Sequence, residues 1–294
     1  MARNDSRRLG LPSGGAAGTT TPPVMDVEEE GSDRPSPLSF VVPTEFVDLP
    51  SKGRYYPENH PLHNQDCLEI RHMTAKDEDI LTSRTLLKKG LALDRFIQNI
   101  LVNKKIDVKK LLVGDKNAIV IAARISGYGA EYDTRVVCPS CLAKVKNSFD
   151  LTKATVVSAD DIDFEELEVT PTDRGTFTFT APKMNVEIEL RLLNGTDEME
   201  IARLSEQNKK NKKLESLLTA QLDRAIVSVN GDSDRKTISY VINNMPASDS
   251  RLLRKKYSAL TPTVDLTQHF ECPECDHEQE LEVPFTADFF WPDR

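Results

Sequence analysis

The amino-acid sequence predicts an α+β protein, and three observations lead to that fold class. Some segments have apolar residues every three or four positions, as in helices, and others alternate apolar and polar residues, as in strands. Two Cys-x-x-Cys phrases, at 138–141 and 272–275, are flanked by segments of the second kind. The chain of 294 residues is long enough for one or two domains with a buried core.

The first part of the chain is expected to pass from disorder to strands and a helix. Residues 1–38 are rich in Gly, Pro, Ser, Thr and acids, and such a segment buries too little apolar surface to offset the entropy of ordering. We therefore expect a disordered N-terminal arm. Structure begins near Phe40, and residues 67–73 alternate as a short strand does. Thr74 is placed to cap a helix that continues to Gly90, a typical C-cap residue.

Two further helices make the region 39–130 mainly helical. Apolar residues at i, i+3, i+4, i+7 and i+8 predict a helix over 93–102. Asp115 is expected to cap a helix that runs to Ile125 and is apolar on most of its faces, so we expect this helix to be buried. Gly127 and Gly129 are expected to end it.

Residues 155–262 are expected to form a separate domain with a β-hairpin and helices. Its first residues, 155–170, are acidic and are interpreted as a linker. Strict alternation over 176–180 and 186–192, with a turn between, predicts the hairpin. Helices are expected at three places: from Gly195 to about 208, from 212 to 229, and from Ala247 to Leu260.

The two Cys-x-x-Cys phrases predict a metal site. Each phrase places two sulfurs on one tight turn, and together they use four of the five cysteines. Four thiolates complete the tetrahedral shell of a structural zinc site and leave no open position for a substrate. Iron would take similar ligands, but nothing else in the sequence indicates electron transfer, so we expect one structural Zn²⁺ per chain. The expected ligands are Cys138, Cys141, Cys272 and Cys275.

The flanks of the two phrases also agree. Val136 and Phe270 precede the cysteines at the same offset, and Phe149 and Val283 follow them at the same offset. Each phrase therefore lies in a strand–turn–strand unit, and residues 131–154 and 263–294 are interpreted as two halves of one zinc ribbon. Each doubling of the intervening loop costs only about 0.6 kcal/mol. A structural zinc contributes about 10–16 kcal/mol, so the ribbon tolerates the inserted domain.

Several other residues carry alternative interpretations. Cys67 with His60 and His63 could form a second metal site, but a buried cysteine beside two loop histidines is favoured. The basic run 209–213 could contact nucleic acid, but without interleaved aromatic residues a solvated helix junction is favoured. The aromatic residues near the C-terminus either pack on their own ribbon or anchor a partner protein, and both interpretations stay open. They are Phe289, Phe290 and Trp291.

The composition also bounds the class of protein. No P-loop, GxGxxG phrase or local Ser-His-Asp pattern is present, so no enzymatic activity is expected. The net charge of −9 argues against a nucleic-acid partner, because a duplex-binding protein usually needs a basic face. The sequence has no apolar run long enough to span a membrane and no apolar leader, so synthesis in the reducing interior of a cell is expected.

Long phrases in the first half resemble the baseplate protein family of T4-like contractile-tailed phages, which includes baseplate hub and hub-assembly proteins. The resemblance rests on Val42–Gly53, Tyr56–Pro57, Met73–Thr82, Leu86–Gly90, Ala122–Gly129 and the closing Phe290–Pro292, together with both cysteine turns.

This resemblance implies a structural or assembly role in the hub or wedge region of a tail baseplate. Other baseplate proteins would be the partners, and no small-molecule substrate is implied. The protein would be made in the host cytoplasm and located in the virion tail or an assembly intermediate. The alternative is a zinc-ribbon adaptor of transcription-type nucleic-acid machinery, which would need a basic face.

Overall fold

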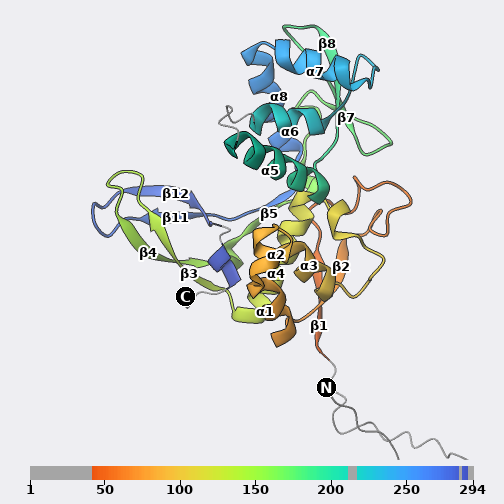
Figure 1. The fold of residues 1–294 in the computed structure, drawn as a ribbon. Coiled ribbons are helices and arrows are strands. Elements are labelled where there is room, and N and C mark those ends of the chain that lie inside the picture. Colours follow the sequence, from red (N-terminus) through yellow and green to blue (C-terminus); the bar gives the residue numbers. More distant parts are fainter. Residues whose placement is uncertain (1–41, 211–216, 285–286, 291–294) are drawn as a thin grey trace, which may run out of the picture. The chain divides into compact units, whose positions relative to one another are not determined.

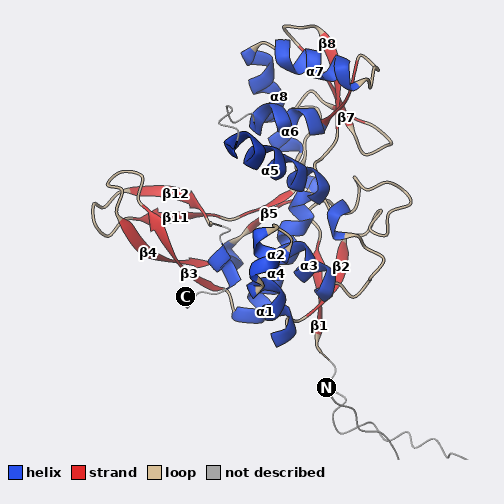
Figure 2. Ribbon diagram, in the orientation of Figure 1, coloured by secondary structure: helices blue, strands red, loops and turns tan. Residues whose placement is uncertain are grey.

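The computed structural model describes residues 42–210, 217–284 and 287–290, and residues 42–294 form one compact unit (Figure 1). Helices and strands both contribute to this unit, which confirms the α+β class (Figure 2). Its buried apolar side chains form one cluster, with members such as Ile70, Phe149, Ile188 and Phe270. The predicted disordered arm, 1–38, lies outside the described residues.

The chain begins with a hairpin and a group of helices. Strands β1 (Thr44–Asp48) and β2 (Cys67–Arg71) pair antiparallel. The helices that follow are α1 (Ala75–Thr82), α2 (Arg84–Lys88), α3 (Ala92–Ile100), the 3-10 turn η1 (Val108–Lys110) and α4 (Val113–Tyr128).

The helix predicted over 74–90 is divided in two. Ser83 is extended, with ψ of 108°, and separates α1 from α2. The hydroxyl of Thr82 donates to the carbonyl oxygen of Glu78 at 2.8 Å, the kind of side-chain bond to the preceding turn that often bends a helix. Gly90 has a φ of +67°, as expected of a residue that follows a helix.

The prediction that Asp115 caps α4 is wrong. The N-cap is Leu112, and Asp115 is buried in the first turn of the helix. Its carboxylate accepts hydrogen bonds from the backbone and hydroxyl of Ser51, at 3.0 and 2.6 Å, and from the hydroxyl of Tyr56 at 2.8 Å. Asp115 therefore holds the β1–β2 loop rather than its own helix. The helix continues through Gly127 to Tyr128 and is followed by Gly129, with a φ of +84°.

Two β-hairpins and a short two-stranded sheet follow. The first hairpin is formed by β3 (Glu131–Val137) and β4 (Lys144–Asp150), the second by β11 (Thr267–Glu271) and β12 (Glu278–Glu282). Strand β5 (Thr155–Val157) follows the first hairpin and strand β10 (Thr263–Asp265) precedes the second, and these two strands pair antiparallel. Residues 155–170, interpreted as a linker, carry β5 and the turn η3 (Ala159–Asp161), and they bury Ala159 and Val169.

The remaining elements form a four-stranded sheet and four helices. The sheet has the order β6 (Thr170–Pro171), β7 (Phe177–Ala181), β8 (Val186–Leu190), β9 (Ile226–Val229), and its β7–β8 hairpin confirms the prediction. The helices are α5 (Gly195–Lys210), α6 (Leu217–Ala225), α7 (Arg235–Asn244) and α8 (Ala247–Leu260), and a last 3-10 turn, η4, spans Ala287–Phe290.

Two of these elements differ from the prediction. The helix expected over 212–229 ends at Ala225, because the Ile-Val-Ser-Val segment that follows pairs with β8 as strand β9. Helix α7 was not predicted. Asp234 caps it by accepting a hydrogen bond from the backbone of Lys236, and Ile238 and Ile242 bury one of its faces.

The strand-to-helix connection occurs twice with the same contacts. Arg71 ends β2 and forms two hydrogen bonds with Asp77 in the first turn of α1, at 2.7 and 2.9 Å. Arg191 follows β8 and forms two hydrogen bonds with Asp197 in the first turn of α5, both at 2.7 Å. The local sequences agree as well: Leu-Glu-Ile-Arg over 68–71 corresponds to Ile-Glu-Leu-Arg over 188–191.

Two further contacts extend this repeat to the long helices. Ile70 of β2 bridges to Leu101 after α3, and the corresponding Leu190 pairs with Ile226 after α6. Asp249, in the first turn of α8, accepts from the backbone of Lys183 and Met184 in the β7–β8 turn, as Asp115 of α4 accepts from the β1–β2 loop. The hairpin β1–β2 with α1 and α4 therefore corresponds to β7–β8 with α5 and α8, and each set precedes one cysteine turn.

Candidate metal centre

The two β-hairpins bring the four predicted cysteines together. Their sulfur atoms all lie within 4.8 Å of one another. The sulfurs of Cys138 and Cys275 are 3.7 Å apart, and those of Cys141 and Cys272 are 3.8 Å apart. A tetrahedron with metal–sulfur bonds of about 2.3 Å has edges of about 3.8 Å, so the sulfurs are spaced for one tetrahedral ion. A disulfide would need about 2.05 Å, and all four thiols are free.

Both turns have the same backbone geometry. In the first, the N–H of Cys138 donates to the carbonyl oxygen of Ala143, and the N–H of Leu142 donates to that of Cys138, both at 2.9 Å. In the second, the N–H of Cys272 donates to the carbonyl oxygen of His277 at 3.0 Å, and the N–H of Asp276 donates to that of Cys272 at 2.9 Å. Leu142 and Asp276 both have positive φ, 61° and 52°, and this conformation closes each turn. The first cysteine of each pair is buried and the second is exposed.

The thiols do not ionise independently. The backbone N–H of Cys141 is the main group that lowers the pKa of Cys138, to about 6, against the opposing effect of burial. The backbone N–H of His277 also lowers the pKa of Cys275, but partial desolvation of its sulfur and the neighbouring thiols outweigh it and raise that pKa to about 12. One thiolate therefore forms readily and the repulsion it creates opposes the next. A divalent cation would remove that repulsion, because thiolates are its ligands.

Contacts beneath the cysteines join the two hairpins. The side-chain oxygen of Gln268 accepts from the backbone N–H of Asp150 at 3.1 Å, and its amide nitrogen donates to the carbonyl of Asp150 at 2.8 Å. Four apolar residues that occupy matching positions in the two flanks are all buried. They are Val136, Phe149, Phe270 and Val283.

Neither the histidine side chains nor the fifth cysteine belongs to this cluster. The ring of His60 stacks on Tyr56, with centroids 4.3 Å apart, and His63 Nδ1 lies 2.7 Å from the carbonyl oxygen of Tyr56. Cys67 is partly buried at the start of β2. His277 contacts Gln279 through its ring at 3.2 Å. Among the described residues, the four cysteines are the one group of three or more His, Cys, Asp or Glu side chains placed to share an ion.

The aromatic residues near the C-terminus are largely inside the protein. Phe289 and Phe290 are 2% and 5% exposed. Their rings lie 5.1 Å from that of Tyr132 and 5.2 Å from that of Phe96, and the guanidinium of Arg124 donates to the carbonyl of Phe289 at 2.8 Å. Trp291 lies outside the described residues. The partner-binding role of this segment stays a prediction.

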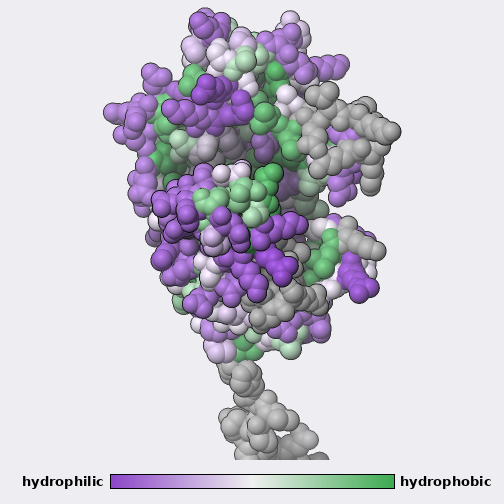
Figure 3. All heavy atoms as spheres, turned by 90° about the vertical axis from the view of Figure 1, so that its left-hand side faces the viewer, coloured by the Kyte–Doolittle hydropathy of each residue, from purple (hydrophilic) through white to green (hydrophobic). Residues whose placement is uncertain are grey.

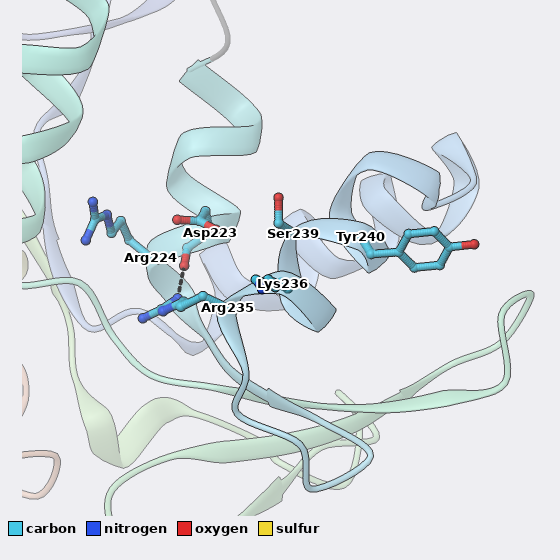
Figure 4. Close-up of a pocket in the computed structure, with 6 residues that line it drawn as sticks. All are labelled: Asp223, Arg224, Arg235, Lys236, Ser239 and Tyr240. Atoms are coloured by element: carbon cyan, nitrogen blue, oxygen red, sulfur yellow. Dashed lines mark hydrogen bonds between the residues drawn. The ribbon is translucent and has the colours of Figure 1, made fainter.

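An open hollow lies between α6 and α7, and sequence reasoning missed it together with α7. Figure 4 shows Arg235 donating to the backbone carbonyl of Asp223, at 2.7 Å, and Tyr240 pointing away from that contact. Arg224 pairs with Glu200 at 2.6 Å, so both arginines already have partners within the chain. The hollow is lined by Asp223, Arg224, Arg235, Lys236, Ser239 and Tyr240. These residues form no arrangement of nucleophile and base.

The surface around these features is mixed in polarity. In the face shown in Figure 3, hydrophilic side chains predominate and hydrophobic ones emerge in small groups between them. Leu142, at the tip of the first cysteine turn, is 73% exposed. No helix of the described residues has both the length and the apolar character needed to cross a membrane.

A comparison with protein families matches most of this chain. The model of a family described as "T4 bacteriophage base plate protein" matches residues 43–291, a range that includes both cysteine turns and both copies of the repeat. Searches of curated proteins and of solved structures found no match.

Proposed function

The chain belongs to this T4 bacteriophage base plate protein family, and from that premise we propose that it is a structural or assembly component of the hub or wedge region of a contractile tail baseplate. The observation that carries the proposal is the length of the family match, residues 43–291. The role is to bind other baseplate proteins, and the location is the virion tail or an assembly intermediate made in the host cytoplasm.

The cysteine cluster supports a structural zinc in this role. Its four sulfurs are spaced for a tetrahedral ion, and such an ion has no open position for substrate. The residues that would hold it are Cys138, Cys141, Cys272 and Cys275. The metal would join the two hairpins at a point where the chain returns after more than a hundred residues, so it stabilises the fold without taking part in catalysis.

We also propose the domain layout that the sequence predicts. Residues 39–130 form the helical region, 131–154 and 263–294 form the two halves of the ribbon, and 155–262 form the inserted domain. The pairing of β5 with β10 supports this layout, because it brings the beginning and the end of the insertion together.

The location is tested by mass spectrometry of purified phage tails and of tail precursors from infected cells. A structural component is expected in both, and an assembly factor only in the precursors. Absence of the chain from both fractions, while it is present in the lysate, would overturn the proposed function.

The metal is tested by elemental analysis of the purified full chain. We expect one zinc per chain and its loss in Cys138→Ser and in Cys272→Ser, with a large fall in stability, since a structural zinc contributes about 10–16 kcal/mol. Cys67→Ser is the matched control and should keep the metal. A chain that folds with no bound metal, or one that carries iron in place of zinc, would contradict the zinc assignment.

A further inference from the structure

Strand β1 has an open edge. The carbonyl of Pro43 accepts from His72 and the N–H of Leu49 donates to Asp66, so odd-numbered residues of β1 direct their backbone groups to β2. The N–H and C=O groups of Thr44, Phe46 and Asp48 therefore point away from it. Within the described residues, β1 belongs to a sheet of two strands and no third strand pairs with this edge.

The repeat shows what occupies the corresponding edge in the second copy. Val47 pairs with Leu68 in β2, and Phe179 pairs with Ile188, the counterpart of Leu68, in β8. Phe46 therefore corresponds to Thr178. Thr178 pairs with Thr170 of β6, so strand β6 covers the edge of β7 that is open on β1.

The described part of the chain cannot supply that strand to β1 in the same way. In the second copy, a turn with Gly175 at a φ of +71° reverses the chain between β6 and β7. The described residues before β1, 42 and 43, form no such turn, because Pro43 already continues the pairing with β2. Within the described residues, therefore, no strand covers this edge of β1.

Two side chains at this edge indicate what a covering strand would carry. Phe46 is 72% exposed, on the face of the sheet opposite to Val47. On the other face, one carboxylate oxygen of Glu45 is buried and has no hydrogen-bond partner among the described residues. Glu45 takes the place of the buried Phe177 of the second copy. A buried acceptor without a donor is destabilising, and a neighbouring strand that brings one removes that cost.

We propose that the open edge of β1 is the docking site for an extended segment of another baseplate protein, which adds a strand to the β1–β2 sheet. Backbone hydrogen bonds to Thr44, Phe46 and Asp48 provide the pairing, as in other cases of strand addition. The docking segment places an apolar side chain against Phe46 and a Lys or Arg beside Glu45. The identity of the partner as a baseplate protein rests on the proposed function, whereas the open edge is observed in the structure independently of it.

Photo-crosslinking tests the proposal in the full chain during infection. Benzoylphenylalanine replaces Phe46 in one variant and Tyr240, which is 69% exposed, in a control. Tails and tail precursors are purified and irradiated, and the linked peptides are identified by mass spectrometry. We expect position 46 to link to one segment of another tail protein, and position 240 not to link to that segment.

The remaining outcomes overturn the docking proposal. A link from position 46 to residues 1–41 or to a second copy of this chain would show a different occupant, and no link in particles that contain the chain would show an unoccupied edge. Absence of the chain from both fractions is a separate result, because it also refutes the proposed function.

Substitutions give a second measurement. Phe46→Lys should lower incorporation into tails at least tenfold, because an edge lysine opposes strand addition. Its unfolding midpoint should match that of the wild type, since Phe46 is exposed. Tyr240→Lys is the matched control. Equal incorporation of the two variants would contradict the proposal.

Discussion

Asp77 shows how one carboxylate connects a strand, a helix start and a neighbouring helix. It accepts two hydrogen bonds from Arg71 of β2, one from the backbone of Thr74 and one from Asn99 of α3 at 2.6 Å. The side chain is fully buried, so each of these donors would lose its partner if the carboxylate were removed.

These contacts make stability depend on pH in a defined direction. Burial acts to raise the pKa of Asp77, but the bonds from Arg71, Thr74 and Asn99 outweigh it and lower the pKa to about 2. Because the folded pKa lies below the ordinary value of 3.8, the contribution is present above about pH 4 and is lost as the pH falls towards 2.

Asp77→Asn should therefore lower the free energy of unfolding by about 2 kcal/mol at neutral pH, and by progressively less between pH 4 and 2. Urea unfolding of the variant and the wild type across this range measures the difference in the free energy of unfolding, and pH effects that are common to both proteins cancel in it. The exposed Asp48→Asn is the control. A difference that does not change with pH would contradict this account.

At the same scale, the sequence identifies the cysteines and misassigns Asp115. The four thiols are recognisable because ligand type and spacing within each turn are local properties, and the structure brings all four together. Asp115 also carries a local signal, an acid at a helix start. Its partners, Ser51 and Tyr56, are distant in the sequence, and no local pattern announces them.

Among the elements, α4 depends on a close approach to β10. A Cβ added to Gly114, in the first turn of α4, would lie 1.9 Å from the carbonyl oxygen of Pro262, the residue before β10. Backbone cannot move aside as a flexible side chain can, so even one methyl group forces the helix and the strand apart.

Gly114→Ala should lower the free energy of unfolding by about 2–3 kcal/mol. Gly127→Ala, in the same helix, is the matched control. Its Cβ would meet the flexible side chain of Met73, at 2.8 Å from the sulfur, and alanine favours the helix, so its effect should stay within about 1 kcal/mol. Denaturant unfolding measures both, and equal effects would show that the contact with Pro262 is unimportant.

The predicted elements agree with the structure where the local pattern is long. They differ from it where pairing with a distant strand, or a short break, determines the secondary structure. Helices α3 and α8 and the β7–β8 hairpin follow their patterns closely. Strand β9 does not, because pairing with β8 turns a segment that could continue a helix into a strand. The break at Ser83 is a single residue in an otherwise helical pattern.

At the level of the whole molecule, the cysteine cluster connects two segments that are far apart in the sequence. Each hairpin retains its own internal pairing, and the hydrogen bonds between Asp150 and Gln268 link the two hairpins in addition to the cysteine cluster. The helix starts at Asp77 and Asp197 are held by separate contacts.

If the cysteine cluster holds the proposed zinc, a chelator that removes it should loosen both hairpins together. Backbone amides in 131–150 and 267–282 should exchange with solvent at least about tenfold faster, whereas amides of α1 and α5 should change little. Hydrogen exchange followed by mass spectrometry measures both regions in one sample. Faster exchange in only one hairpin would contradict a shared metal site.

The repeat also has a consequence for stoichiometry. Any assembly of n copies of this chain contains 2n related modules. The two modules differ at one edge, which is open on β1 and covered by β6 on β7. Such an assembly therefore offers n open edges, one for each chain, although its related modules are twice as many.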